Sequence, residues 1–126
     1  MIISRKTKPE KEKVSAMILK VAEGYIDMGE TVEEKENYLR SACSAWNIGC
    51  MTGKKRENDL KHYIKTYKKI NKADKEDCKS LEEDLRKLIK RKDELYPDVN
   101  NIQVVDSKIE RKNGQDHVMV ASMKIE

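Results

Sequence analysis

Residues 102–125 read IQVVDSKIERKNGQDHVMVASMKI and decide how the C-terminal part of the chain folds. Two runs rich in β-branched and other apolar residues flank Asn113-Gly114, the dipeptide that most favours a two-residue hairpin turn. The pattern predicts one β-hairpin with strands over about 102–111 and 116–125. A two-residue turn pairs Lys112 with Gln115.

The same turn fixes the strand register and reveals an irregularity. It pairs Ile109 with Val118 and, near the open end, Ile102 with Ile125. These two apolar pairs then fall on opposite faces, so we expect a β-bulge or a strong twist near 105–107. A lone hairpin is marginally stable in water. It must therefore pack on helices or pair with another chain.

Upstream of residue 102 the apolar residues recur with helical spacing. Pro9 suits the first turn of a helix, and Gly29 suits its end. Residues Thr31 to Glu34 form a capping box at the start of the next helix. Asp74 is a natural N-cap for the last one. The patterns predict helices over about 9–28, 32–51, 54–72 and 75–95. Whether the second and third helices are separate at Thr52-Gly53 stays open. The predicted fold class is mainly α (α+β): a three- to four-helix bundle followed by a C-terminal β-hairpin. We expect residues 9–126 to form one domain and residues 1–8 to be a flexible N-terminal segment.

The composition places the chain among small globular proteins. Its 126 residues are 40% charged and 37% hydrophobic, with a net charge of +4. No apolar run reaches the eighteen or so residues of a membrane-spanning helix, and the first residues lack the apolar core of a secretory signal. Three cysteines at irregular spacing suit reduced thiols. We expect a cytoplasmic protein with no membrane contact.

Residues 52–72 hold eight basic and two acidic side chains, and so account for the excess positive charge. A stripe of lysines follows one side of this predicted helix: Lys54, Lys61, Lys65, Lys68 and Lys72. Such a ridge can track a phosphate backbone. However, Tyr63 and Tyr67 lie on the apolar side and are not interleaved with the lysines, as base stacking would require. A solvated helix face is the more ordinary interpretation.

Metal and catalytic chemistry have little support in the sequence. Cys43 and Cys50 are seven residues apart, about 10.5 Å along a helix, which is too far for a disulfide or one zinc ion. We interpret them as core residues and expect no metal and no cofactor. The remaining weak pocket candidates on and near the second helix are Arg40, Cys43, Trp46, Asn47 and His62. Trp46 is better explained as a core residue.

These observations rank three hypotheses about function. The first is a non-enzymatic interaction module that binds a protein partner, or a second copy of itself, through its helices or its hairpin edge. The second is binding of a nucleic-acid backbone through the basic helix 54–72. The third and weakest is a small enzyme or regulator with a pocket near Cys43.

Overall fold

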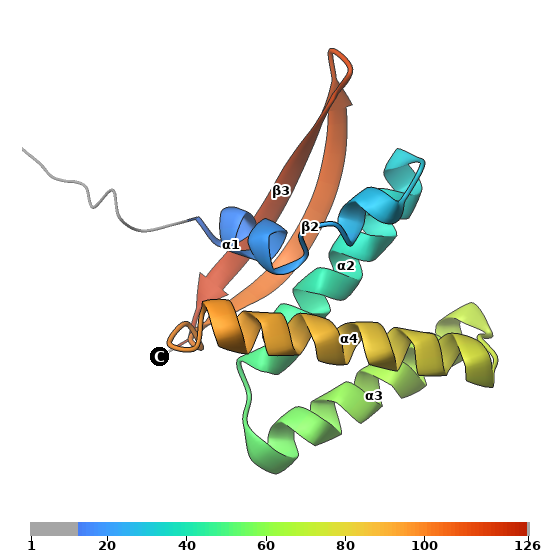
Figure 1. The fold of residues 1–126 in the computed structure, drawn as a ribbon, viewed down its shortest axis with the longest axis vertical. Helices are drawn as coiled ribbons and strands as arrows, with labels where there is room; N and C mark the ends of the chain where they lie inside the picture. Colours follow the sequence, from blue (N-terminus) through green and yellow to red (C-terminus); the bar gives the residue numbers. More distant parts are fainter. Residues whose placement is uncertain (1–12, 126) are drawn as a thin grey trace, which may run out of the picture.

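The computed structural model describes residues 13–125 and confirms the predicted fold class (Figure 1). Within that range a run of helices precedes one antiparallel β-hairpin. The helices are α1 (Val14–Val21), the short 3-10 helix η1 (Ile26–Met28), α2 (Val32–Gly49), α3 (Gly53–Asn71) and α4 (Lys75–Leu95), and the strands are β2 (Ile102–Lys112) and β3 (Gln115–Lys124). The predicted flexible segment 1–8 and the helix start at Pro9 lie outside the described residues.

The first helix is shorter at its C-terminal end than predicted. Expected to run to residue 28, it ends at Val21. Gly24, in the turn that follows, has a φ of +82°, a conformation that glycine adopts readily and that breaks the helix. Ile26 is still buried, but it belongs to η1 and not to a continuous helix.

The predicted N-caps of α2 and α4 are confirmed, and they fix where these helices begin. Thr31 Oγ1 accepts from Glu34 N at 3.1 Å. The Glu34 carboxylate accepts in return from Glu30 N at 2.8 Å, one residue before the usual position. Asp74 Oδ1 accepts from Asp77 N at 2.8 Å. Helices α2 and α3 are separate, since three residues lie between the end of α2 at Gly49 and the start of α3 at Gly53.

Helix α2 lies at the centre of the fold, with the hairpin on one side and α4 on the other (Figure 1). The apolar stripe of this helix is buried throughout: Leu39, Ala42, Cys43, Trp46, Gly49 and Cys50. Small side chains on this helix let neighbouring elements approach closely. Helix α1 contacts both α2 and β3, and so closes the core on the side of the hairpin.

The hairpin has the predicted turn and the predicted bulge. Lys112 pairs with Gln115 and Ile109 with Val118. The register then shifts between Val104 and Asp106, so that one extra residue of β2 is accommodated there. Because of this shift Ile102 pairs with Lys124. The expected pairing of Ile102 with Ile125 is therefore wrong by one residue.

Polar side chains of α2 hydrogen-bond to the edge of β2 that faces away from β3. Asn47 Nδ2 donates to Val104 O at 3.0 Å, and its Oδ1 accepts from Val104 N at 2.7 Å. Trp46 Nε1 donates to Ile102 O at 3.0 Å, and Glu36 Oε2 accepts from Ile109 N at 2.8 Å. These bonds satisfy backbone groups that a third strand would otherwise take. The hairpin thus packs on the helices through β2, which leaves β3 as the other edge.

Candidate interaction surfaces

The outer edge of β3 carries unpaired backbone groups. Ile109 N donates to Glu36 and not to β3, so the Ile109–Val118 pair is of the non-hydrogen-bonded type. Val118 therefore directs its N–H and C=O away from β2, and so do Val120 and Ser122 further along. Within residues 13–125, no backbone or side-chain hydrogen bond reaches these outward groups.

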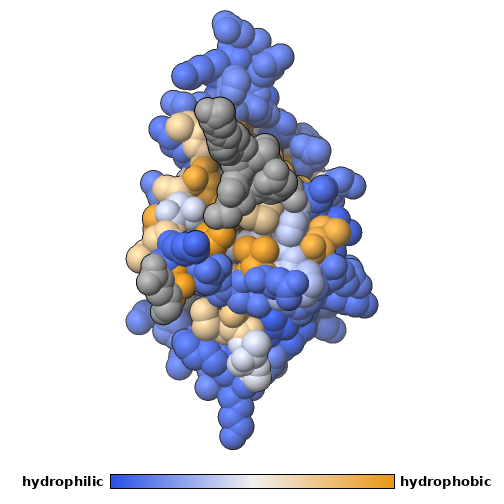
Figure 2. All heavy atoms as spheres, turned by 90° about the vertical axis from the view of Figure 1, so that its left-hand side faces the viewer, coloured by the Kyte–Doolittle hydropathy of each residue, from blue (hydrophilic) through white to orange (hydrophobic). Residues whose placement is uncertain are grey.

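Exposed apolar side chains accompany this edge. Met119 and Met123 are 44% and 55% exposed on the outer face of β3. Figure 2 views the side that is on the left of Figure 1, and shows apolar residues around the middle of that face with hydrophilic ones above and below. An exposed strand edge with apolar neighbours is a ready template for another strand.

The lysine stripe on α3 is fully solvent-facing. All five predicted lysines are exposed: Lys54, Lys61, Lys65, Lys68 and Lys72. Among residues 13–125 none of them forms an ion pair. The structure leaves this stripe available to an anionic partner.

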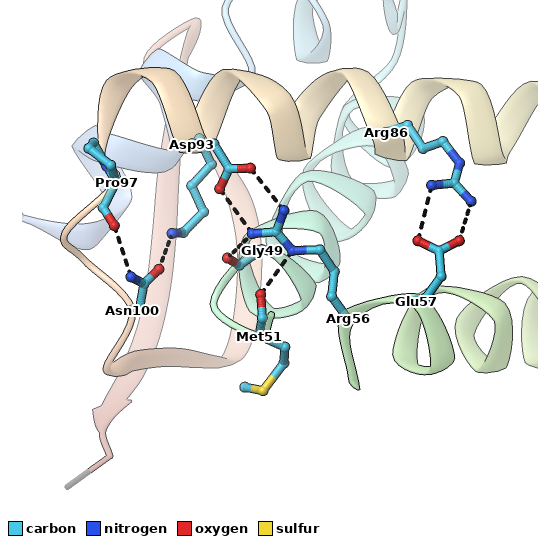
Figure 3. A network of polar contacts seen from close by, with 9 residues as sticks. Gly49, Met51, Arg56, Glu57, Arg86, Asp93, Pro97 and Asn100 are labelled. Atoms are coloured by element: carbon cyan, nitrogen blue, oxygen red, sulfur yellow. Dashed lines mark hydrogen bonds and ion pairs between the residues drawn. The ribbon is translucent and has the colours of Figure 1, made fainter. Parts of the chain in front are cut away.

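The arginines near this helix are instead committed to the fold (Figure 3). Arg56 forms a bidentate ion pair with Asp93 at 2.9 Å, and also donates to Met51 O and Gly49 O at 2.8 Å each. It therefore ties α3 to α4 while satisfying carbonyls at the end of α2. Arg86 of α4 forms a similar bidentate pair with Glu57.

Lys92 of α4 is completely buried, which its place among the basic residues of the last turns did not indicate. Its Nζ donates to Asn100 Oδ1 at 2.9 Å and lies 4.8 Å from the ring centroid of Trp46. Burial lowers the pKa of this ammonium group. Gly49 of α2 makes room for its stem, because a Cβ there would lie 2.8 Å from Lys92 Cδ.

The residues of the predicted Cys43 pocket take part in separate contacts. Cys43 is buried, near the Ser107 side chain on β2. Asn47 is occupied by β2, as described above. Arg40 is exposed, and its Nη1 donates to Asn37 Oδ1 at 2.7 Å. His62 is exposed on α3. Trp46 is 1% exposed, so the interpretation of it as a core residue is confirmed.

We expect the three thiols to differ in reactivity, with Cys78 reacting first. Burial raises the pKa of Cys43 to about 11 and also raises the pKa of Cys50, so both stay protonated at neutral pH. Cys78 is only half-buried. Brief iodoacetamide treatment followed by peptide mass mapping should find label at Cys78 well before the other two. Urea-unfolded protein is the control and should label all three alike. Preferential labelling of Cys43 in the folded protein would contradict this prediction and revive the pocket hypothesis.

Comparison with known protein families, with characterised proteins and with solved structures finds no match to this chain. Across residues 13–125 no helix is both long enough and apolar enough to cross a membrane. Over the same range no three His, Cys, Asp or Glu side chains are grouped as a metal ion would require.

Proposed function

We propose that this protein is an interaction module that binds an extended strand along the outer edge of β3. The observation that carries the proposal is the row of unbonded backbone groups at Val118, Val120 and Ser122. Main-chain hydrogen bonds to such an edge supply affinity, and neighbouring side chains supply specificity. We also propose a cytoplasmic location, because free cysteines persist in a reducing compartment.

A second copy of the chain is the occupant that the charges of this edge favour. If two β3 strands pair antiparallel about a two-fold axis at Val120, Val118 faces Ser122 of the other copy. In that register Asp116 faces Lys124, once on each side of the axis. Arg111 and Lys35 lower the pKa of Asp116 to about 2, so this carboxylate is charged at neutral pH. Opposite charges directly across a strand pair are favourable.

Blocking the edge should abolish self-association. Ser122 is exposed and its N–H points outward, so Ser122→Pro removes an edge donor without removing a β2–β3 hydrogen bond. We expect the wild type to form dimers as its concentration rises from micromolar toward millimolar, and the proline variant to stay monomeric. Light scattering after size-exclusion chromatography measures both.

Two further variants serve as the control for the proline substitution and as a test of the strand register. Ser122→Thr is the matched control and should dimerise like the wild type, because threonine keeps the N–H. Lys124→Glu should weaken the dimer by placing two like charges together. A wild type that is monomeric over the whole range, or a proline variant that dimerises normally, would refute self-association through β3.

Nucleic-acid binding through α3 is the second candidate, favoured by the exposed lysines of the stripe. Changing Lys61, Lys65, Lys68 and Lys72 to glutamine should strongly weaken binding of labelled DNA and RNA in fluorescence anisotropy at low salt. For duplex DNA, the slope of log affinity against log salt should fall by roughly 0.9 for each phosphate that the variant no longer neutralises.

A control variant with the same change in net charge is available on α4. It replaces another set of exposed lysines, namely Lys75, Lys79, Lys87 and Lys90. We expect this variant to bind like the wild type if the α3 stripe is the site. Absence of binding at low salt, or equally weakened binding in the two variants, would exclude a specific role for the stripe.

A further inference from the structure

A cavity of about 620 Å³ lies between the N-terminal half of α2, the C-terminal half of α3 and the N-terminal half of α4. These halves of the three helices are on the right of Figure 1. Four of the five tyrosines of the chain line it, from three separate parts of the sequence: Tyr25, Tyr38, Tyr63 and Tyr67. We call it the tyrosine groove. Its volume is typical of sites for small ligands or for a few side chains of a peptide. Tyrosine is also enriched at protein interfaces, because its ring is rigid and its hydroxyl tolerates water.

Two of these rings form a corner inside the groove. The centroids of Tyr25 and Tyr38 are 4.9 Å apart, and the ring planes meet at 75°. Burial of Tyr25, together with the carboxylate of Asp84, raises its phenol pKa. Two aromatic walls with a carboxylate close by is an arrangement that attracts a cation, through the ring faces and through the negative charge.

The charge of the groove is opposite to that of the chain. Glu34, Asp77 and Asp84 line it against a single basic residue, Arg40, although the whole protein carries +4. Arg40 donates to Asn37 at 2.7 Å, and Glu34 accepts from Glu30 N. Asp77 and Asp84 have no ion-pair partner within residues 13–125. Phosphate groups would be repelled here, and cationic groups attracted.

We propose that the tyrosine groove binds a basic segment of a partner protein, with one lysine or arginine side chain in the corner between Tyr25 and Tyr38. Asp84 balances the charge of that side chain. Ile70 is 74% exposed at the rim of the groove and offers an apolar contact to a flanking aliphatic residue. The site is separate from the β3 edge and needs no self-association.

A labelled peptide with two arginines set among leucines tests the proposal on the full chain. Its companion carries citrulline, which has nearly the shape of arginine without the charge. By fluorescence anisotropy the arginine peptide should bind in the micromolar range and the citrulline peptide about tenfold more weakly. Equal binding of the two peptides, or no binding of either, would overturn the proposal.

Variants then locate the site. Asp84→Asn keeps the shape of the side chain and should weaken binding of the arginine peptide about tenfold. Glu94→Gln removes one exposed carboxylate of α4 outside the groove and should leave binding unchanged. Tyr38→Phe keeps the ring and should retain binding, whereas Tyr38→Leu should abolish it. Thermal unfolding of each variant distinguishes damage to the site from damage to the fold. Equally weakened binding in Asp84→Asn and Glu94→Gln would refute the site.

The remaining occupants are distinguished by the same variants, in the anisotropy assay and by light scattering. If the arginine peptide fails to bind but Asp84→Asn changes the dimerisation of the chain, the groove takes a second copy and the proposal is wrong. Preference for labelled DNA over the arginine peptide at the groove would likewise overturn it. Ser122→Pro should bind the peptide like the wild type. If the arginine peptide does not bind, the proposal for the tyrosine groove is wrong and the proposal for the β3 edge still stands. If the chain does not dimerise through β3, the proposal for the groove still stands.

Discussion

Replacing Trp46 by alanine should lower the free energy of unfolding by about 3 to 5 kcal/mol. The indole is 1% exposed and fills the space between α2, β2 and the end of α4. Alanine would leave a cavity, remove the stronger of the two donors to the carbonyl of Ile102, which then keeps only Cys50 Sγ at 3.4 Å, and remove the ring beneath the buried ammonium of Lys92. For a domain of this size such a loss is a large share of the total stability. Urea unfolding followed by circular dichroism measures it.

Trp46→Phe separates packing from hydrogen bonding at the same position. It keeps an aromatic ring near Lys92 but loses the Nε1 donor, so we expect a cost of about 1 to 2 kcal/mol. An alanine variant that loses less stability than the phenylalanine variant would show that the indole is not the centre of the core.

Replacing Gly49 by alanine should also destabilise the fold, by about 1 to 3 kcal/mol. Alanine normally favours a helix over glycine by up to about 1 kcal/mol, so a loss here opposes the intrinsic trend. The new Cβ would lie 2.8 Å from Lys92 Cδ, and Lys92 has little room to move because it is fully buried. The midpoint and slope of urea unfolding give the change.

A double-mutant cycle tests this explanation directly. In a Lys92→Ala background the obstructing stem is absent, so Gly49→Ala should cost nothing or become favourable, a coupling of about 1 to 3 kcal/mol. Lys92→Met is the matched control, because it keeps the stem and should keep the cost of Gly49→Ala. Additive effects in the alanine cycle would show that Gly49 is needed for some other reason.

Elements that depend on local chemistry were predictable from the sequence. The Asn113-Gly114 turn, the caps at Thr31 and Asp74 and the bulge follow from residues close together in the chain. The end of α1 was not predictable in the same way. Its apolar periodicity continues through Ile26, while the break depends on the backbone conformation of Gly24.

The burial of Lys92 could not be predicted because it depends on distant residues. Its neighbours Gly49 and Trp46 are more than forty positions away in the sequence. The exposure of the lysine stripe followed from periodicity alone. In contrast, the tyrosine groove joins three segments, and the sequence pattern placed Tyr63 and Tyr67 on the apolar side of their helix without indicating a groove. The one available signal was the hydroxyl group, which favours positions that are only partly buried.

Side chains of α2 hold β2 by main-chain groups of the strand, and this affects which sequences the hairpin can have. Asn47, Trp46 and Glu36 bond to N–H and C=O groups that almost every amino acid supplies. The anchorage therefore sets few conditions on the outward side chains of the hairpin. Residues on the outer face of the hairpin can therefore be substituted, in evolution or by design, and a new sequence can be inserted at the turn without changes in the helices.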